Sequence, residues 1–353
     1  MATRKILCLG ASYGSLLGIK LAMAGHHVTL VCLPEEVELI NTHGALVRMP
    51  VRGREGLVDI HSRDLPGQID AAGPGDVDPG AYDLIALAMQ EPQYGADGVR
   101  QLLDAIGRSQ KPTMSIMNMP PLPYLKRIAA IDAASVEACF TAPEVWSSFT
   151  PGKLTLCSPD PQAFRPPDQP LNVLQVRLPT NFKAAAFEDD ADTAILRDLQ
   201  ADIEAATVPV DGTPTTLPVK LKAHDSIFVP LAKWAMLLAG NYRCVQADQM
   251  RPIQEAVHTD LEASHGVYAH VVALCERLGA DPADMVPFEK YAQAAQALGS
   301  PSSAARALAA GARNIERVDK LVQTLGQQQG MPHAEVDATV ALVDGWLAKN
   351  RAA

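Results

Sequence analysis

The chain lacks long apolar runs, concentrated positive charge and closely spaced cysteines. None of its apolar runs reaches the roughly 20 residues that span a bilayer, so we expect no membrane segment. The net charge is −10 without a basic stripe, which argues against nucleic acid as a partner. The first residues, MATRKILCLG, lack the small-residue cleavage site of a signal peptide, and we therefore expect a cytoplasmic protein.

Cysteine and histidine spacing predicts neither a disulfide framework nor a metal site. The six cysteines are scattered, and Cys8 and Cys32 fall in predicted buried strands, so we predict reduced thiols. His258, His265 and His270 are predicted on one long helix, at intervals of seven and five residues. Without carboxylates on the same face, these intervals do not make a ligand set, and we predict no metal.

With 353 residues, 48% of them apolar, the chain is long enough for two domains with full cores. In the first half, short apolar runs alternate with helical patterns, whereas residues 64–80, rich in Gly, Pro and Asp, are predicted to form a loop. Repeated strand–helix units of this kind build a doubly wound parallel sheet. From Val219 onward the pattern is helical almost throughout, over residues 226–240, 248–278, 287–296, 302–326 and 333–348.

The predicted fold class is therefore α/β followed by all-α. A Rossmann-type doubly wound parallel sheet is expected over residues 1–212 and a helical domain over residues 219–350, with residues 211–218 as the linker. The helical domain would contribute to the substrate site, and its long amphipathic helices make a homodimer plausible.

The most informative stretch is KILCLGASYGSLLG, residues 5–18. It predicts a buried strand, a tight turn and a helix, the opening unit of a dinucleotide-binding fold. The turn is small, so the N–H groups at the helix N-terminus can approach a pyrophosphate. The usual three-glycine pattern is present in part, as Gly10-x-Ser12-x-x-Ser15 with Gly14 displaced by one position. The alternative is a tight turn of an α/β protein that binds no nucleotide.

Lys233 and Asn241 interrupt an otherwise apolar predicted helix. A lysine in such a helix is costly to bury unless its charge is useful or its pKa falls. Helical residues eight apart differ by only about 80° around the axis, so the two side chains are expected to point broadly the same way. An ammonium and a carboxamide facing a cleft can bind a carbonyl and donate a proton to it. The alternative is that Lys233 extends its ammonium to water.

These motifs, in this order, resemble those of the ketopantoate reductase family over essentially the whole chain. The resemblance implies a Rossmann domain, a helical C-terminal domain and NADPH-dependent reduction of a 2-oxo acid to a 2-hydroxy acid. The family's catalytic lysine matches Lys233, and its asparagine eight residues later matches Asn241. Its asparagine after a central strand matches Asn118, and a serine that opens a late helix matches Ser302.

The resemblance also implies the cofactor and substrate contacts. The family's phosphate turn falls on residues 10–15, so the expected contacts are Gly10, Ser12, Tyr13, Gly14 and Ser15, joined by Gln90 and Asn118. Substrate contacts are expected at Ser302, Asn314 and Leu237.

Three of these positions depart from the family pattern. Gln90 replaces a lysine, Leu237 an asparagine, and Asn314 the late glutamate that holds the ketopantoate hydroxyl, although Glu316 lies close by. Met119-Pro120-Pro121 also replaces the glycines that usually follow the strand-end asparagine. We therefore expect a carbonyl substrate that is less acidic or more apolar than ketopantoate.

The choice between NADP and NAD stays open on the sequence. The family tends to place a basic residue at the end of the second strand, where this chain has Leu33. Glu35 and Glu36 follow, and they could repel a 2′-phosphate and accept ribose hydroxyls, which favours NAD. They could equally be the charged first turn of a helix.

Two other functions remain as alternatives. An opine-type dehydrogenase, which reduces an imine with a His-Asp pair, is kept open by His224-Asp225, although Asp225 is expected to be a helix N-cap. A non-catalytic nucleotide-binding protein is suggested by the altered residues Gln90, Leu237 and Asn314.

Overall fold

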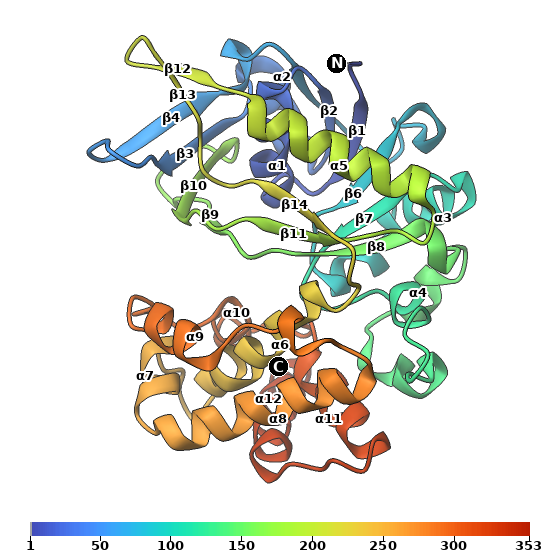
Figure 1. Ribbon diagram of the computed structural model, residues 1–353, viewed down its shortest axis with the longest axis vertical. Coiled ribbons are helices and arrows are strands. Elements are labelled where there is room, and N and C mark those ends of the chain that lie inside the picture. The colour runs from blue at the N-terminus through green and yellow to red at the C-terminus, as the bar shows by residue number, and fades with distance from the viewer. Residues whose placement is uncertain (1) are drawn as a thin grey trace. The chain divides into compact units, whose positions relative to one another are not determined.

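A computed structural model describes residues 2–353, which fall into two compact units (Figure 1). The first unit contains the residues up to Met89, Gln93–Tyr124 and Glu144–Ile227. The second contains Gln90–Pro92, Leu125–Pro143 and Phe228–Ala353.

The first unit is built on an eight-stranded sheet in the order β14-β11-β8-β7-β6-β1-β2-β5. Neighbouring strands are parallel except β8 and β11, which are antiparallel. The strands are β1 (Lys5–Leu9), β2 (His27–Val31), β5 (Gln68–Ala72), β6 (Leu84–Leu87), β7 (Thr113–Ile116), β8 (Leu154–Ser158), β11 (Phe182–Ala185) and β14 (Leu221–His224). From β5 to β8 the strand order is that of a doubly wound sheet, which reverses beside β1. The predicted fold class is thus confirmed for this unit.

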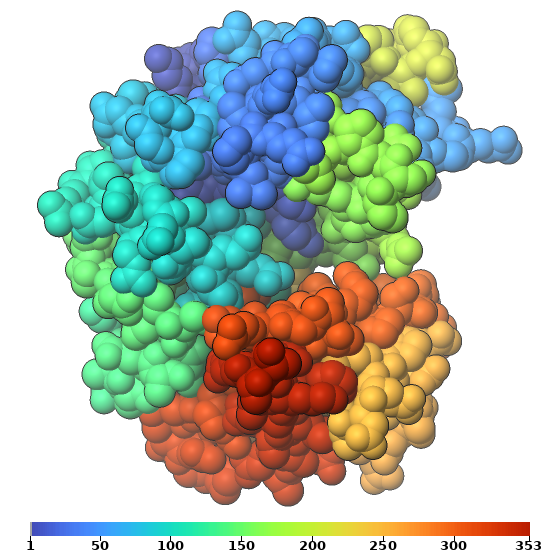
Figure 2. Space-filling view, turned by 180° about the vertical axis from the view of Figure 1, so that it is seen from behind, coloured from blue at the N-terminus to red at the C-terminus, as the bar shows by residue number. Residues whose placement is uncertain are grey.

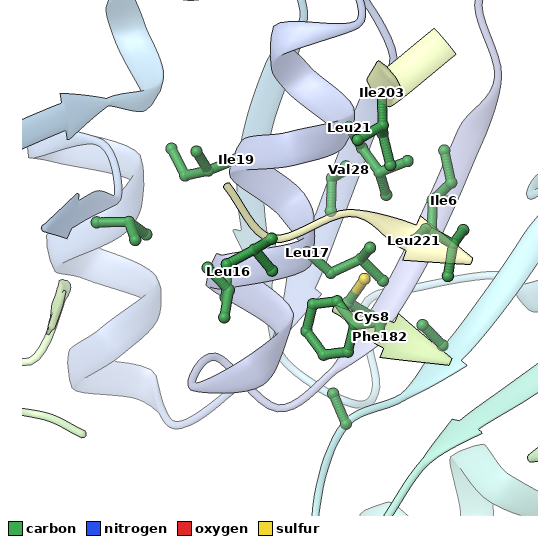
Figure 3. Close-up of a cluster of buried hydrophobic side chains, with 14 of the residues drawn as sticks. Ile6, Cys8, Leu16, Leu17, Ile19, Leu21, Val28, Phe182, Ile203 and Leu221 are labelled. Atoms are coloured by element: carbon green, nitrogen blue, oxygen red, sulfur yellow. The ribbon is translucent and has the colours of Figure 1, made fainter. Parts of the chain in front are cut away.

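Helices of the first unit cover this sheet through apolar faces. They are α1 (Tyr13–Met23), α2 (Pro34–His43), α3 (Val99–Ser109) and α5 (Asp190–Ala205), whereas the single turn α4 (Leu122–Leu125) ends at Leu125, which belongs to the second unit. Figure 3 shows Leu16 and Leu17 of α1 in one buried cluster with Ile6 and Cys8 of β1 and Phe182 of β11, all nearly inaccessible to solvent. Burying each such aliphatic side chain stabilises the fold by about 1.5–3 kcal/mol. Burial also raises the pKa of the Cys8 thiol to about 12, so it stays protonated.

A second, four-stranded sheet has the order β4-β3-β10-β9. Its strands are β3 (Leu46–Pro50), β4 (Leu57–His61), β9 (Gln162–Phe164) and β10 (Val173–Leu178). Because β10 pairs in parallel with β3, residues 162–178 lie beside a segment that comes more than a hundred residues earlier in the chain (Figure 1). The turn between β3 and β4 projects at the surface of the first unit (Figure 2).

Two segments predicted as irregular contain strands. Within the predicted loop 64–80, Gln68–Ala72 forms β5, which pairs in parallel with β2; its alternating polar residues are those of an edge strand. Residues 208–215 form a hairpin of β12 (Val208–Val210) and β13 (Thr213–Thr215), so the segment 211–218 lies within the first unit. The side-chain amine of Lys20 in α1 donates to the carbonyls of Leu217 (3.2 Å) and Pro218 (3.0 Å) and holds the end of this segment on the helix.

The second unit is helical, as predicted. Its helices are α6 (Lys233–Met236), α7 (Ile253–His258), α8 (Leu261–Leu278), α9 (Phe288–Ala295), α10 (Ser303–Ala309), α11 (Val318–Gln328) and α12 (Ala334–Ala352). The predicted helix 248–278 was wrong in its extent, because Asp260 caps a new helix by accepting the N–H of Ala263 (2.9 Å). His258 therefore ends α7, whereas His265 and His270 lie on α8. The predicted helix 302–326 likewise divides into α10 and α11.

Three further findings concern the expectations about membrane segments, cysteines and metal ligands. Within residues 2–353, no helix is long and apolar enough to cross a bilayer. The six cysteines are free thiols, but Cys32 lies just after β2 and is only half-buried, so its expected place inside a strand was wrong. In the same described part of the chain, no three His, Cys, Asp or Glu side chains gather as a metal ion would require.

Candidate functional site

The turn between β1 and α1 depends on a glycine at its first position. Gly10 has a φ of +101°, and a Cβ added there would lie 2.6 Å from Cγ of Met89 and 2.8 Å from the carbonyl oxygen of Ala88. The end of β1 thus touches the end of β6, and the N–H of Gly10 donates to Val31 at the end of β2 (2.8 Å). This is the point where the strand order reverses, which is where doubly wound sheets bind their ligands.

Gly14 and Ser15 let α1 begin close against the sheet. A Cβ on Gly14 would lie 3.3 Å from a methyl of Leu30, tighter than ordinary van der Waals contact, and 3.4 Å from Cβ of Cys8, at the limit of such contact. Gly14 therefore serves the close helix–strand packing of the third fingerprint glycine, although it is displaced in sequence. The Ser15 hydroxyl is buried and donates to the carbonyl of Ala11 (2.6 Å), so it stabilises the turn from within.

Ser12 and Tyr13 form the outer part of this turn. Ser12 is the N-cap of α1, is half-exposed, and makes no side-chain capping bond within the described chain. Tyr13 packs its ring edge-on against Phe182, with the centroids 6.3 Å apart, and its hydroxyl donates to the carbonyl of Pro161 (2.8 Å). The Tyr13 side chain thus anchors the turn to the sheet. N–H groups at a helix N-terminus bind anions. A pyrophosphate would therefore fit against the backbone of this turn, Ser12 and the start of α1.

Asn118 lies at the same edge of the sheet. It follows β7, which is the neighbour of β6 and parallel to β1, and its side chain is half-buried. The structure therefore brings Asn118 and the Gly10 turn to the carboxyl ends of three adjacent parallel strands. Gln90, one residue after Met89, is exposed and is grouped with the second unit.

In the second unit, Lys233 and Asn241 lie within an irregular helical segment that runs from Val229 to Cys244. Lys233 begins α6 and is half-buried, and Leu237–Asn241 then form a π-helical turn in which the N–H of Tyr242 donates to the carbonyl of Leu237. One extra residue in a turn takes up about 100° of rotation, which removes most of the about 80° between α-helical residues eight apart. Lys233 and Asn241 therefore share a face more closely than a regular helix would allow. Such turns are frequent at functional sites.

Two side chains from later in the chain hold this turn. The hydroxyl of Tyr291 on α9 donates to the carbonyl of Met236 (3.0 Å), and burial raises the pKa of that phenol, so it remains a donor. The hydroxyl of Ser302 donates to the carbonyl of Asn241 (2.7 Å) and accepts the N–H of Ala305 (3.1 Å), capping α10. Ser302 is buried, and the structure places it directly beside Asn241.

Gly240→Ala tests whether the π-helical turn depends on Tyr291. A Cβ at Gly240 would overlap the Tyr291 hydroxyl, so we expect the variant to lose about 1–3 kcal/mol of unfolding free energy in urea titrations. In Gly240→Ala/Tyr291→Phe the nearest ring atom is 3.2 Å from the new Cβ, and part of the loss should return. The control is Gly266→Ala on α8, where nothing lies within 4 Å and stability should rise by roughly 0.5–1 kcal/mol. A Gly240→Ala variant as stable as that control would contradict the overlap.

The other expected substrate contacts lie in different settings. Leu237 is 4% exposed, within the π-helical turn. Asn314 is exposed, and its Oδ1 accepts a hydrogen bond from Arg351 of α12 (3.0 Å). The Asn314 side chain is thus paired with the C-terminal helix, whereas Asn241 is paired with Ser302.

The sequence did not predict that two buried glutamates of the second unit, Glu91 and Glu316, lie close together. Glu316 is 7% exposed and Glu91 1%, and the N–H of Glu91 lies 3.4 Å from Oε1 of Glu316. Glu91 accepts the N–H (2.9 Å) and the hydroxyl (3.0 Å) of Thr141. Burial, with the nearby Glu316 charge, raises the pKa of Glu91. Only the fold could reveal this pair, because its members are far apart in sequence.

The expected helix start at His224-Asp225 was wrong. His224 ends β14, and Asp225 is exposed and pairs with Arg197 of α5. Because β14 runs antiparallel to β8 through β11, its carboxyl end lies toward the edge of the sheet opposite the Gly10 turn. Consecutive residues of an extended segment also point to opposite faces, so the two side chains do not form an acid–base pair at the nucleotide edge.

Comparisons with known proteins identify the fold but not a sequence family. No family model and no curated protein match this chain. Among solved structures, a 2-dehydropantoate 2-reductase from Methylococcus capsulatus is similar with a TM-score of 0.66 and 15% identity, covering 98% of this chain and 97% of that one. A ketopantoate reductase of the PanE/ApbA family from Ralstonia eutropha JMP134 gives a TM-score of 0.63 and 16% identity, with coverage of 98% and 99%.

A third neighbour is a ketopantoate reductase from Staphylococcus aureus that is described as dimeric, with a TM-score of 0.62, 9% identity, and coverage of 98% and 99%. Each likeness extends over nearly the full length of both chains. The chain thus has the fold of ketopantoate reductases, and the resemblance found in the sequence is confirmed at the level of the fold.

Proposed function

We propose that this chain is an NAD(P)-dependent oxidoreductase that reduces a 2-oxo acid or a related carbonyl to the hydroxy compound, or catalyses the reverse reaction. One observation carries the proposal: the Gly10 turn lies at the reversal point of a doubly wound sheet in a chain with the ketopantoate reductase fold. The 2-dehydropantoate 2-reductase neighbours make carbonyl reduction the reaction class to expect. Residues 1–212 would bind the dinucleotide and residues 219–350 the substrate.

The residues of the first unit would hold the cofactor, which supplies or accepts hydride when bound. The backbone at Gly10, Ser12 and Gly14 would receive the pyrophosphate, with Ser15 and Tyr13 keeping the turn in shape. Asn118, at the same sheet edge, would orient the cofactor or substrate. Gln90 is proposed as a further polar contact to the cofactor.

Residues of the second unit would act on the substrate. The Lys233 ammonium would donate a proton to the carbonyl oxygen as the carbonyl is reduced, and it would recover that proton from water. Asn241 would hydrogen-bond the same region of the substrate, held in place by Ser302 through its backbone carbonyl. Leu237 and Asn314 replace polar and acidic groups of the family pattern, which supports a substrate that is less acidic or more apolar than ketopantoate.

This function predicts oxidation of NADPH or NADH by a carbonyl compound. Fluorescence titration should first show that a reduced dinucleotide binds, and its absorbance should then fall when 2-oxo acids with apolar side chains are added, faster than with ketopantoate. Imines formed from 2-oxo acids and amines complete the panel. Oxidation by imines alone would indicate an opine-type dehydrogenase, and binding without oxidation by any compound would indicate a non-catalytic nucleotide-binding protein.

For its setting in the cell, we propose a cytoplasmic homodimer acting on a small molecule, with no nucleic-acid or membrane partner. The dimeric Staphylococcus aureus neighbour supports the dimer.

A further inference from the structure

The residues after β2 lie where doubly wound folds distinguish NAD from NADP. An acidic side chain at this position accepts a hydrogen bond from the ribose 2′-hydroxyl of NAD, whereas a nearby arginine accommodates the 2′-phosphate of NADP. In this chain Leu33, which follows β2 closely, is 67% exposed, and Cys32 to Glu36 include no basic residue. On sequence alone, the two glutamates either favour NAD or form the charged first turn of a helix, and the choice between NADP and NAD stays open.

In the structure, the Glu36 carboxylate is already engaged by other groups of the protein. The Glu36 side chain is buried, and Oε2 accepts the N–H of Leu33 (3.0 Å), which caps the start of α2. Its other oxygen, Oε1, forms an ion pair with Nη2 of Arg165. Both carboxylate oxygens of Glu36 thus have partners and its charge is neutralised, whereas Glu35 is exposed on the first turn of α2.

The strand pairing of the second sheet brings Arg165 close to Glu36. Arg165 follows β9, which pairs with β10, and β10 pairs with β3, the strand after α2. Its side chain is 28% exposed, so it is neither buried in the ion pair nor free in solvent. A guanidinium has five N–H donors in a planar fork, and the closest contact with Glu36 is made by Nη2. The remaining donors suit a second anion.

The thiol of Cys32 is affected by the same two charges. Burial, with a contribution from Glu36, raises its pKa to about 12, and Arg165 opposes this rise. The Arg165 charge therefore acts at the first residue after β2.

We propose that Arg165 is the residue that binds the 2′-phosphate of NADP and makes this chain prefer NADP over NAD. The inference rests on the proposed dinucleotide site. Arg165 replaces, from a distant part of the chain, the basic residue that is missing at Leu33. Glu36 positions the guanidinium by holding Nη2, and the phosphate binds the other side of the fork through charge-assisted hydrogen bonds.

Binding measurements separate the 2′-phosphate from the rest of the dinucleotide. Fluorescence titrations with NADPH and NADH, and calorimetry with 2′,5′-ADP and 5′-AMP, should show that the wild type prefers the 2′-phosphorylated ligand of each pair. In Arg165→Gln, the Kd for NADPH should rise roughly 10–100-fold, as expected for loss of a charge-assisted contact, while the Kd for NADH changes less than about twofold. The control is Arg177→Gln, which removes an exposed guanidinium of the same sheet that lies over the Phe164 ring, 5.5 Å from its centroid.

A double variant separates direct contact from screening. Arg165→Gln leaves the Glu36 carboxylate uncompensated, and that charge alone could repel a phosphate. Glu36→Gln/Arg165→Gln removes both charges, and we expect it to remain without NADPH preference. A return of that preference in the double variant would show that Arg165 only neutralises Glu36, and would overturn the proposal.

Other outcomes distinguish this proposal from the proposed function. A wild type that binds NADH more tightly than NADPH, or an Arg165→Gln variant with an unchanged ratio of the two affinities, would overturn the role of Arg165 and leave the oxidoreductase intact. A wild type that binds none of the four ligands would overturn the dinucleotide site itself. Far-ultraviolet circular dichroism and the unfolding midpoint confirm that each variant is folded before it is titrated.

Discussion

Lys233→Ala is expected to lower turnover roughly 10²–10⁴-fold while NADPH and NADH bind as they do to the wild type. The reason is the proposed proton donation, which matters only as the carbonyl is reduced and not when the dinucleotide binds. Single-turnover absorbance of the reduced cofactor gives the rate of the chemical step, and fluorescence titration gives the cofactor Kd. The loss should appear in kcat with any carbonyl substrate that the wild type accepts.

Lys290→Ala is the matched control for this experiment, because Lys290 is an exposed lysine on α9 of the same unit. Lys233→Arg keeps a positive charge but cannot release its proton as readily, and it should recover little of the rate. Unchanged turnover in Lys233→Ala would remove Lys233 from the mechanism. A loss of cofactor affinity as large as the loss of turnover would instead give it a binding role.

Lys20→Met is expected to change the pH dependence of stability by several kcal/mol. Lys20 is 1% exposed, and burial, with the nearby Lys220 charge, lowers its pKa from 10.5 to about 7. The unfolded chain therefore holds a proton between pH 7 and 10.5 that the folded chain has released, so the contribution of Lys20 to stability increases as the pH rises through this window. At about 1.4 kcal/mol for each pKa unit, the whole change is on the order of 4–5 kcal/mol.

The methionine variant lacks this titration and leaves the carbonyls of Leu217 and Pro218 without the lysine donor. In urea unfolding, Lys20→Met should therefore be more stable than the wild type near pH 6, and this advantage should shrink and reverse toward pH 10. Lys5→Met, which removes an exposed ammonium from β1, controls for the loss of one positive charge. A difference in unfolding free energy between Lys20→Met and the wild type that is the same at pH 6 and pH 10 would contradict this prediction.

The sequence was sufficient for the features that depend on local pattern. A short apolar run before Gly10 predicts a strand buried on both faces, and small residues up to Ser15 predict the tight turn, because both signals lie within a few residues. The helical character of the second unit followed from its residue pattern for the same reason. The β5 strand was missed because Gln68–Ala72 is a short edge strand with polar side chains, and its identity comes from pairing with β2.

What the sequence could not reveal are the contacts between distant residues that refine the site. The π-helical turn depends on the Tyr291 hydroxyl and on the absence of a side chain at Gly240, and neither has a periodic signature. The partner of Glu36 is Arg165, which a local reading of the residues after β2 cannot include. The break between α7 and α8 could not be predicted from the sequence either. Asp260 is recognisable as a helix cap only from the hydrogen bond that its side chain accepts from the N–H of Ala263.

The route by which Arg165 reaches Glu36 bears on how coenzyme choice could be altered in evolution or by engineering. The glycine turn, α1 and β2 form one continuous stretch, whereas the guanidinium belongs to a hairpin on a separate sheet. On the proposed role of Arg165, a single exchange on that hairpin would switch the accepted coenzyme while every residue of the fingerprint stayed the same. Inspection of the fingerprint alone would then assign the wrong coenzyme to proteins built on this plan.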